Sequence, residues 1–320
     1  MKKLLLIVAC LFLLAGCGHV KLSNGENAIV TLEGVDDISS DDLYKELKDA
    51  NGASTIMNLI DKRILNKLYE TTSEEKKHIS DSIKSAKKSA KEMNADLDAY
   101  LSYYYGVSNE DAYKEYLSLN YKRDLWATDY SKEIVTEKQL NEYYENEYYG
   151  DIDAKHILIT VDVSSDASSE DKTKAENEAF DKAVEIIDKL KNGEKFDDLA
   201  KKYSQDKTTS SKGGSLGKIN IGDYDEDVLN ALKDMENDTY STTPVKSTYG
   251  YHVLYKVSQD EKKELSEVTD KIKEIIGSEL KEESGFSIKS LKALREKYKV
   301  EFKDAELEKG YESLMQKYGA

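Results

Sequence analysis

Apolar residues recur at steps of three and four positions in the first and last parts of the chain. In the first part, one such stripe is formed by Ile56, Leu59, Ile60, Ile64 and Leu68. This spacing predicts a helix over about 53–70, because residues three and four apart share one face of a helix. Further helices are predicted over about 73–94, 96–104, 108–133 and 136–148, and in the last part over 264–283, 288–298 and 305–317.

Two short strands are predicted outside these helices. The first is the apolar run of residues 28–32, which precedes a helix N-cap signal at Ser39 and Ser40. The second is Lys299-Val300-Glu301-Phe302, where polar and apolar residues alternate. We expect these two strands to pair. Pairing across almost the whole chain would make the middle of the sequence an insertion whose two ends lie close together.

The middle of the chain follows another pattern, which begins after Gly150-Asp151. Residues 154–161 are rich in β-branched side chains and predict a strand, and 170–191 predict a helix that stops at Asn192-Gly193. A second short helix has an inner face of Phe196, Leu199, Ala200 and Tyr203. Three glycines within 213–217 predict a tight turn, followed by a short helix and strands over 242–247 and 251–257.

The first residues have the pattern of an export signal. Lys2 and Lys3 precede an apolar run from Leu4 to Leu14, which is too short for a permanent membrane span of about 20 residues. The following Leu14-Ala15-Gly16-Cys17 resembles the lipobox of bacterial lipoproteins. That resemblance implies a signal peptide over 1–16, lipidation of Cys17 and a tether over 17–27. The alternative is an ordinary secretory signal with a chance cysteine.

Composition excludes several classes of function. The 320 residues include 47 Lys and Arg against 63 Asp and Glu, giving a formal net charge of -16, which repels nucleic-acid phosphates. We therefore expect no nucleic-acid partner. The length suggests two domains. Cys10 leaves with the signal peptide and Cys17 carries lipid, so no thiol remains for a disulfide or a metal site.

No metal or cofactor is expected from the remaining motifs. His19 and His78 have no second histidine at ligand spacing. The glycines at 213–217 lack the Lys-Ser/Thr of a phosphate-binding loop, and Ser204 is not framed by glycines as a hydrolase nucleophile is. Twelve of the 23 tyrosines lie between Tyr100 and Tyr149. We interpret most of them as packing between helices, and a minority as lining a groove for unfolded proteins.

Five segments of the middle region together resemble a parvulin-type peptidyl-prolyl isomerase domain. They occur in the order of that family and cover about residues 152–258: Ala154-Lys155-His156-Ile157-Leu158, Phe196 to Asp206, Gly213-Gly214-Ser215-Leu216-Gly217, Pro244-Val245 and Tyr249-Gly250-Tyr251-His252-Val253. With the lipobox in front and helices on both sides, the whole chain resembles the PrsA-type extracytoplasmic foldase lipoproteins of Gram-positive bacteria. The parvulin resemblance is specific because all five segments occur together; each motif alone would be weak evidence for the family.

The resemblance implies an α+β fold with a parvulin-like domain inserted between two helical segments. In this scheme residues 28–149 and 259–320 pack into one chaperone domain, and residues 150–258, a small antiparallel sheet surrounded by helices, project from it. The implied partners are unfolded or partly folded exported proteins, and the membrane through the lipid at Cys17. The implied location is the extracytoplasmic face of the cell membrane. A homodimer is a further expectation from the resemblance, although no strict heptad seam supports one.

The resemblance also implies the site. His156 and His252 occupy the positions of the paired core histidines, Asp206 the position that is Cys or Asp in the family, and Leu216 the proline pocket. Tyr224 and Val228 stand where the family usually has Met and Phe, and Tyr249 precedes the glycine before the second histidine. These residues predict catalytic roles for His156, Asp206 and His252, and substrate binding for Leu216, Tyr224, Val228 and Tyr249.

Two functions remain open at this point. The first is a foldase that catalyses cis/trans isomerisation of Xaa-Pro peptide bonds in exported proteins. The second is a chaperone that holds its clients without catalysis, with the parvulin-like domain as a binding platform. For the two histidines, a structural role in the sheet is as compatible with the residue type as a catalytic one. A solute-binding lipoprotein is disfavoured, because the sequence lacks two α/β lobes.

Overall fold

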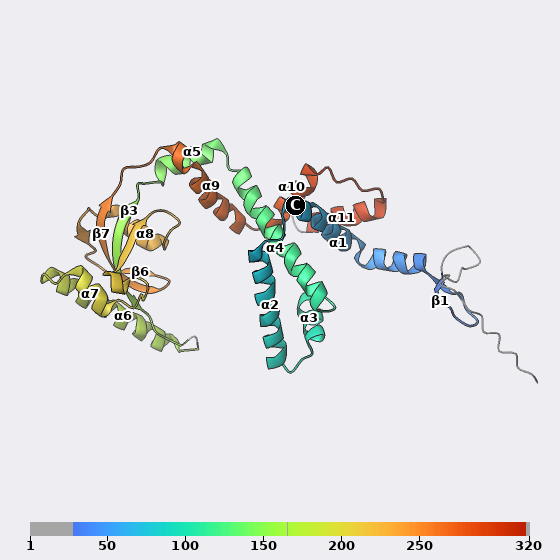
Figure 1. Ribbon diagram of the computed structural model, residues 1–320, viewed down its shortest axis with the longest axis horizontal. Helices are drawn as coiled ribbons and strands as arrows, with labels where there is room; N and C mark the ends of the chain where they lie inside the picture. Colours follow the sequence, from blue (N-terminus) through green and yellow to red (C-terminus); the bar gives the residue numbers. More distant parts are fainter. Residues whose placement is uncertain (1–27, 165, 318–320) are drawn as a thin grey trace, which may run out of the picture. The chain divides into compact units, whose positions relative to one another are not determined.

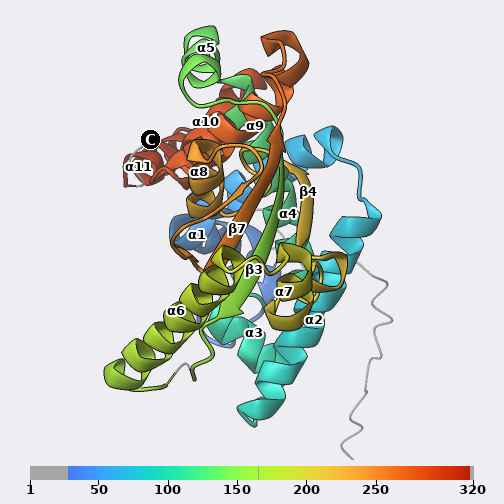
Figure 2. The same ribbon diagram turned by 90° about the vertical axis from the view of Figure 1, so that its left-hand side faces the viewer.

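The computed structural model describes residues 28–164 and 166–317 (Figures 1 and 2). The chain divides into two compact units. One comprises the residues up to Tyr130 together with those from Lys281 onward, and the other comprises Ser131–Leu280. Among the residues described, no helix is both long enough and apolar enough to span a bilayer.

The first unit is built from helices and one small hairpin. Its helices are α1 (Ser40–Leu68), α2 (Ser73–Glu92), α3 (Leu97–Tyr105), α4 (Glu110–Glu133), α10 (Phe286–Lys297) and α11 (Ala305–Lys317), of which α4 extends into the second unit. The hairpin pairs β1 (Ala28–Val30) with β2 (Ile38–Ser39). Ser39 then caps α1, accepting a hydrogen bond from the Asp42 amide as predicted by the N-cap signal.

The core of the first unit joins helices from both ends of the sequence. Trp126 of α4 is buried against Ile64 and Leu65 of α1 and Leu294 of α10. Its indole Nε1 donates a hydrogen bond of 2.7 Å to the carbonyl of Ser290. The burial of an aromatic ring with a satisfied polar edge fixes α4 against α10. Of the tyrosines of α3 and α4, Tyr100, Tyr105 and Tyr113 pack in a neighbouring cluster around Leu101, whereas Tyr103, Tyr104 and Tyr116 are exposed.

The predicted strand at 299–302 is wrong. The strand at residues 28–30 pairs instead with Ile38–Ser39, close by in the sequence. Lys299 has a left-handed backbone with φ of 49°, and the Val300 amide donates to the Arg295 carbonyl at 3.1 Å. These bonds form a helix-terminating motif at the end of α10, in which the apolar residue after the left-handed one packs back on the helix. The alternating pattern therefore reflects a helix end, with Val300 packed on the core.

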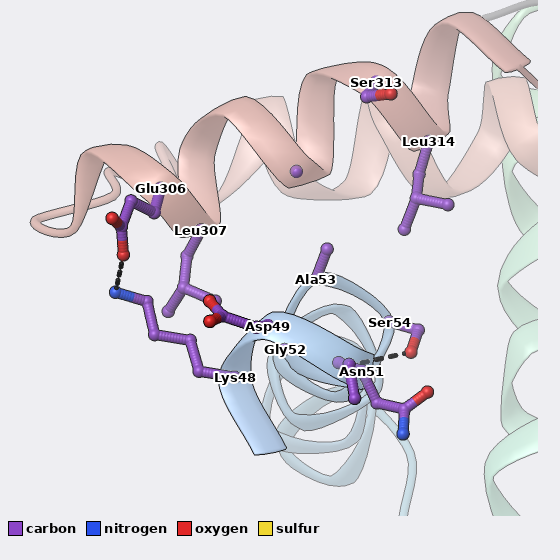
Figure 3. A pocket seen from close by; sticks show the side chains of 12 residues that line it. Lys48, Asp49, Asn51, Gly52, Ala53, Ser54, Glu306, Leu307, Ser313 and Leu314 are labelled. Carbon is purple, nitrogen blue, oxygen red and sulfur yellow. Dashed lines mark hydrogen bonds and ion pairs between the residues drawn. The ribbon is translucent and has the colours of Figure 1, made fainter. Parts of the chain in front are cut away.

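Helix α11 crosses α1 where both helices carry small residues. A Cβ atom added to Gly310 would lie 2.9 Å from the Ala53 Cβ, and one added to Gly52 would lie 2.8 Å from a Leu307 methyl group. Figure 3 shows Gly52 and Ala53 facing α11 beside a hollow bounded by Lys48 and Glu306, which form an ion pair. Glycine is required here by the close approach of the two helices rather than by backbone conformation.

The second unit contains an antiparallel sheet with the order β4-β3-β7-β5, and β6 pairs with the first residues of β7. The strands are β3 (Ile152–Thr160), β4 (Ser215–Ile219), β5 (Thr239–Tyr240), β6 (Val245–Ser247) and β7 (Gly250–Gln259). Strand β3 is central and pairs with β7 along its whole length. The glycine-rich segment predicted as a turn becomes part of β4, with Gly217 at φ of 71° beside a register shift against β3. Gly213 and Gly214 thus form a turn, and Gly217 lies in the edge strand β4 that follows it.

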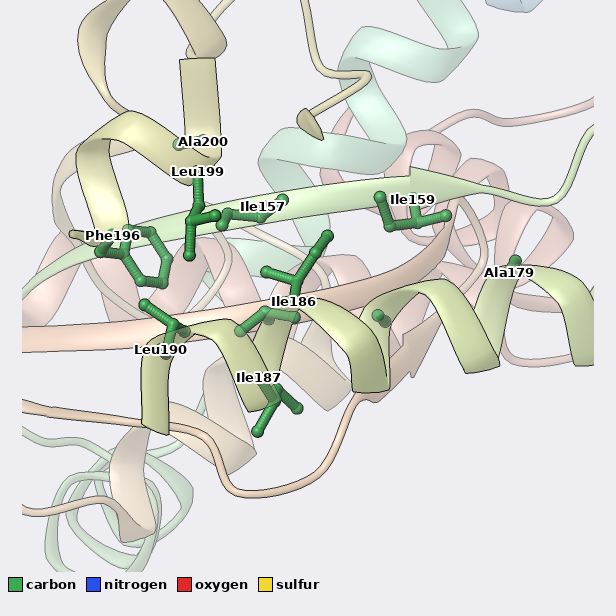
Figure 4. Packing of buried hydrophobic residues seen from close by; sticks show 11 residues of the cluster. Ile157, Ile159, Ala179, Ile186, Ile187, Leu190, Phe196, Leu199 and Ala200 are labelled. Carbon is green, nitrogen blue, oxygen red and sulfur yellow. The ribbon is translucent and has the colours of Figure 1, made fainter. Parts of the chain in front are cut away.

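Helices cover both faces of this sheet. Alternate residues of β3, Ile157 and Ile159, pack with α6 (Ser169–Lys191) and α7 (Phe196–Tyr203), as Figure 4 shows. The opposite face carries Ile152 and Ala154, which pack against α8 (Glu226–Asp234). Because successive side chains of a strand point to opposite faces, His156 and Leu158 lie on the α8 face. The sheet therefore presents both histidines away from the larger apolar cluster.

Two further helices complete the second unit. Helix α5 (Glu137–Asn146) contributes Leu140 to a cluster that includes Val268 and Ile272 of α9 (Leu265–Glu282). Helix α9 also reaches the loop after β4, because Lys271 forms an ion pair with Asp223 at 3.0 Å. The second compact unit thus contains α5 and most of α9 together with the sheet, whereas the scheme expected from sequence assigned residues up to 149 and from 259 to the helical domain.

The glycine at position 310 generates a prediction about stability. Gly310→Val places a branched side chain where even a Cβ is too close to Ala53, and we expect the free energy of unfolding to fall by about 1–3 kcal/mol. Lys309→Val, at the exposed neighbouring position of the same helix, is the control and should cost less than about 1 kcal/mol. Urea unfolding followed by Trp126 fluorescence measures both. Equal losses of the free energy of unfolding in the two variants would contradict the prediction, because they would show that α1 and α11 can move apart at no energetic cost.

Candidate active site

The paired strands bring two histidine rings into contact. Leu158 on β3 lies opposite His252 on β7, and His156 lies opposite Leu254. The two rings are therefore diagonal neighbours on one face, with their Nδ1 atoms 3.0 Å apart and their planes inclined by 26°. Both side chains are fully buried. A buried ring nitrogen needs a hydrogen-bonding partner, and here each histidine supplies one for the other.

Asp206 lies at one end of this pair, in the loop after α7. Its Oδ2 is 2.8 Å from the His156 Nε2 and accepts a hydrogen bond from the Thr209 hydroxyl at 2.5 Å. Its Oδ1 accepts from both the amide and the hydroxyl of Thr208, at 2.9 Å and 2.7 Å. Both carboxylate oxygens are thus held by donors, which fixes the direction in which the carboxylate points.

Ser247 lies at the other end. Its Oγ is 2.7 Å from the His252 Nε2 and also accepts a hydrogen bond from the Tyr249 amide at 3.0 Å. The β6–β7 hairpin places this hydroxyl, because Val245 pairs with His252 and Ser247 with Gly250. A Cβ atom at Gly250 would come within 2.2 Å of the Ile159 carbonyl, so glycine permits the close approach of β3 to this hairpin.

The network determines where each proton resides. An ionised Asp206 only accepts hydrogen bonds, so the His156 Nε2 carries the proton and its Nδ1 is an acceptor. His252 must then donate through its Nδ1, which leaves its Nε2 to accept from Ser247. The Tyr224 hydroxyl also reaches the His156 Nδ1, at 3.1 Å. Proton positions assigned in this way satisfy every ring nitrogen with both histidines neutral.

The pKa values agree with this assignment. Burial lowers the pKa of His156, although Asp206 opposes the effect, and burial together with the neighbouring His156 lowers the pKa of His252 to about 4. Burial raises the pKa of Asp206, but hydrogen bonds from Thr209, Thr208 and His156 outweigh it and hold that pKa well below its usual range. The site therefore places an ionised Asp206 next to two neutral imidazoles at neutral pH, and the carboxylates of Asp223 and Asp225 also line the cavity.

Asp206 and His252 face a cavity of about 690 Å³. Its apolar lining includes Leu158 and Leu216, and Tyr224 adds a ring that meets the His156 ring edge to face, at 87°. Burial and the charge of Asp206 raise the pKa of the Tyr224 hydroxyl to about 12, so it remains a hydrogen-bond donor. The cavity is open to solvent and large enough for a short peptide segment.

The structure brings most of the predicted site residues together. Asp206, Leu216, Tyr224, Tyr249 and His252 line the cavity, and His156 lies behind them, bonded to Asp206 and His252. Tyr249 is two-thirds exposed at the rim.

Val228 differs from the other predicted binding residues. It is fully buried on α8 in the cluster against which Leu216 and Tyr224 pack, and it does not line the cavity. The valine therefore supports the residues that form the cavity wall. Cys17, the predicted lipidation site, lies outside the described residues.

Several residues of the site were not predicted from sequence. Thr208 and Thr209 hold Asp206, Leu158 lines the cavity, and Ser247 completes the histidine pair. The threonines follow Asp206 directly, and side chains two and three residues after an aspartate commonly bond it, so a local signal existed. Ser247 could be found only by recognising that Gly250 closes a hairpin in front of His252. In the described part of the chain, no group of three or more His, Cys, Asp or Glu side chains has the arrangement of a metal site.

The buried histidines predict that this unit loses stability in mild acid. The pKa of His252 is about 4 in the folded chain against 6.5 in the unfolded one, so the unfolded chain takes up protons first as the pH falls. The contribution of His252 to the free energy of unfolding is fully present above about pH 6.5 and is lost progressively as the pH falls to about 4. Between pH 7.5 and 5.0 we expect a loss of about 2 kcal/mol from His252, with a loss of the same sign from His156.

Urea unfolding followed through the amide resonances of β3 and β7 measures this loss. His252→Gln should flatten the pH dependence. The matched control, His78→Gln on the exposed face of α2, should retain the slope of the unchanged chain. An identical slope in all three proteins would contradict the assignment of a neutral, buried His252.

Comparison with known proteins places this site in a family. Residues 156–259 match the rotamase family described as the PPIC-type PPIASE domain. Foldase protein PrsA of Geobacillus kaustophilus is 32% identical over 280 residues, covering 85% of this chain and 84% of the relative. Foldase protein PrsA of Bacillus subtilis is 30% identical over 293 residues, covering 89% of this chain and 86% of the relative.

A solved structure shares the fold. The crystal structure of foldase protein PrsA from Streptococcus pneumoniae aligns over 91% of this chain and 99% of that chain, with a TM-score of 0.56 at 20% identity. The family match covers both histidines, Asp206 and the cavity-lining residues described above. The identity to the relatives, in contrast, extends over most of the chain on both sides of the sheet. The chain therefore belongs to the PrsA foldase family and carries a PPIC-type peptidyl-prolyl isomerase domain.

Proposed function

We propose that this protein catalyses cis/trans isomerisation of Xaa-Pro peptide bonds in unfolded or partly folded exported proteins, at the extracytoplasmic face of the membrane to which a lipid on Cys17 anchors it. The observation that carries the catalytic part is the open cavity in which an ionised, fully oriented Asp206 lies beside the apolar Leu216 and the ring of Tyr224. The names of the relatives, which are foldase proteins, support the choice of client.

The chemistry requires no covalent bond to break. Rotation about an amide has a barrier of about 18–20 kcal/mol, because the nitrogen shares its lone pair with the carbonyl. In the planar amide this sharing places negative charge on the oxygen, and in the twisted amide that charge returns to the nitrogen. A site lowers the barrier when it binds the twisted amide better than either planar form.

The apolar side of the cavity is suited to the proline ring. Leu158 and Leu216 supply aliphatic contacts, and the Tyr224 ring supplies a flat face. Burial of the ring removes water from around the adjacent peptide bond. Removal of water weakens the hydrogen bonds that stabilise the planar, more polar amide, and it strengthens any electrostatic effect within the cavity.

Asp206 supplies the electrostatic effect. A carboxylate near the carbonyl oxygen of the bound peptide repels the negative charge of the planar form and disfavours the twisted form less. The Tyr224 hydroxyl remains protonated, and by turning its one proton away from the His156 Nδ1 it can donate to the lone pair that localises on nitrogen during rotation. The Asp206 carboxylate and the Tyr224 ring act without moving, since Thr208 and Thr209 hold Asp206 and the His156 ring lies against Tyr224.

The histidines act mainly by positioning in this mechanism. His156 bonds Asp206 and Tyr224 from behind and does not line the cavity, and His252 with Ser247 fixes the orientation of His156. Their neutral state matters because a protonated His156 would form a salt bridge that cancels part of the Asp206 charge.

Asp206→Asn tests the catalytic proposal. The change keeps the shape of the side chain and removes its charge, and we expect kcat/KM for an Xaa-Pro tetrapeptide to fall by at least about tenfold. Protease-coupled kinetics or exchange spectroscopy on the exported form of the full chain measures the rate. Asp198→Asn, at an exposed position of α7, is the matched control and should leave the rate unchanged.

Two results would contradict the catalytic proposal. One is an equal rate in Asp206→Asn and the unchanged protein. The other is an absence of acceleration by a folded chain, which would favour the alternative of a chaperone that holds clients through a non-catalytic cavity.

Cys17→Ser tests the anchor. Two acyl chains hold a protein stably on a membrane, whereas removal of the acylated thiol leaves no anchor of this kind. We expect the variant to lose incorporation of labelled palmitate and to move from the membrane fraction to the supernatant. Cys10→Ser, which changes a thiol within the predicted signal peptide, is the control and should keep both label and membrane association. Membrane association of Cys17→Ser equal to that of the control would refute the lipid anchor.

A further inference from the structure

A group of buried charges lies in the helical unit, at the junction of α1, α4 and α10. Asp61 of α1 is fully buried. Arg123 of α4 donates to its Oδ2 through Nη2 at 2.6 Å and through Nε at 3.1 Å. Arg295 of α10 donates to Oδ1 through Nε at 2.9 Å and to Oδ2 through Nη2 at 2.8 Å. One carboxylate thus binds two guanidinium groups.

The group carries more positive than negative charge. Asp61 supplies one negative charge against the two positive charges of Arg123 and Arg295. The additional partners of the arginines are neutral. Arg123 reaches the Asn58 amide oxygen at 2.8 Å, the Arg295 Nη1 faces the Met315 sulfur at 3.5 Å, and the Arg295 guanidinium lies 5.6 Å from the centre of the Tyr311 ring. A thioether is a weak acceptor, so the Arg295 Nη1 has a poor partner although its side chain is only 3% exposed.

A cavity of about 290 Å³ opens beside these arginines. Both guanidinium groups contribute to its wall. Most of the remaining wall is apolar and comes from α1, α10 and α11, with the side chains Met57, Ile288, Leu291, Leu314 and Met315. Its volume is sufficient for one aliphatic or aromatic side chain together with a small polar group. The cavity is therefore lined by two arginines that share one carboxylate and, for most of its remaining wall, by apolar side chains.

We propose that this cavity binds the C-terminal residue of a polypeptide whose last side chain is apolar. The terminal carboxylate lies against Arg123 and the Arg295 Nη1, and the last side chain lies among Leu291, Leu314 and Ile288. A guanidinium group matches a carboxylate in shape and charge, and its hydrogen bonds to a carboxylate are stronger than those between neutral groups. A second carboxylate would also balance the net positive charge that remains on the group after the one carboxylate, Asp61, that the described residues place against both arginines.

The chemistry of the walls favours this ligand over an inorganic anion. Phosphate or sulfate needs donors on every side, whereas five of the nine side chains that line this cavity are apolar and only Arg123 and Arg295 carry positive charge. An unfolded protein exposes its chain end together with apolar residues, so the site would hold a part of a client that is independent of proline. The site belongs to the helical unit, and its failure would leave the isomerase proposal intact.

Binding of two short peptides to the full exported chain tests the inference. The probes are acetyl-Ala-Ala-Leu with a free carboxylate and the same peptide as the C-terminal amide, titrated by calorimetry at pH 7 and 150 mM salt. We expect the acid to bind at least about tenfold more tightly than the amide, because the amide lacks the charge. Arg123→Gln, which keeps the Asp61–Arg295 pair, should abolish this preference.

Two further variants separate binding from folding. Arg63→Gln removes the same charge from an exposed position of α1 and should keep the preference for the acid. Ile288→Trp fills the cavity without touching an ion pair and should weaken binding of the acid at least about tenfold. Equal affinity for acid and amide, no binding of either peptide, or an unchanged preference in Arg123→Gln would overturn the proposal.

Discussion

The antiparallel pairing of β3 with β7 is the constraint on which the site depends. It sets Leu158 opposite His252 and His156 opposite Leu254, so that the two imidazole rings meet on one face. A shift of one residue in this register would turn one histidine into the apolar cluster beneath α6 and α7, away from the ring nitrogen of the other histidine that now satisfies it. The buried contact between the rings and the register of the strands therefore stabilise each other.

Once the register is set, the direction of every hydrogen bond follows from the ionised end at Asp206. The chain of bonds runs from Asp206 through His156 and His252 to Ser247, and it ends where the serine accepts the Tyr249 amide. With both rings neutral and Asp206 ionised, only one placement of the ring protons avoids two donors facing each other in this chain of hydrogen bonds. Its members consequently restrict one another's motion, and Asp206 and Tyr224, which are bonded to His156 and line the cavity, are held in place by the same bonds.

The sequence patterns predicted the helices and the strands β3, β6 and β7, and the family resemblance supplied most of the cavity residues, whereas β4 and β5 were not predicted as strands. The helix over 305–317 and the end of α6 at Asn192-Gly193 follow from local patterns, which explains their agreement with the structure. Residues whose role depends on distant contacts were harder to predict. The resemblance placed Val228 in the substrate pocket by its position in the family's pattern, yet the direction of α8 turns its side chain into the core.

Val300 illustrates the same limit at the end of a helix. Its alternation with charged neighbours resembles that of a strand, but a left-handed Lys299 and a bond back to the Arg295 carbonyl use the same residues to terminate α10. Local periodicity does not distinguish these outcomes, because both place one apolar residue between two polar ones. The difference lies in whether a partner strand is present, and β1 pairs with β2 instead.

The histidine pair of the sheet and the Asp61 group of the helical unit satisfy their buried polar groups in different ways. The histidines remain neutral and share their hydrogen bonds, and the buried Lys256 ammonium of the same sheet donates to the carbonyls of Lys233 and Met235. In the helical unit, Asp61 compensates two arginines that arrive from helices 62 and 234 residues away in sequence. Loss of that one carboxylate would leave two like charges facing each other among apolar side chains, and the cost of breaking a buried pair in this way is about 3–5 kcal/mol. The N-terminal and C-terminal segments of the unit are therefore joined by an electrostatic contact between Asp61 and Arg295. Binding a second anion beside the two arginines would destabilise this contact less than removing the Asp61 carboxylate.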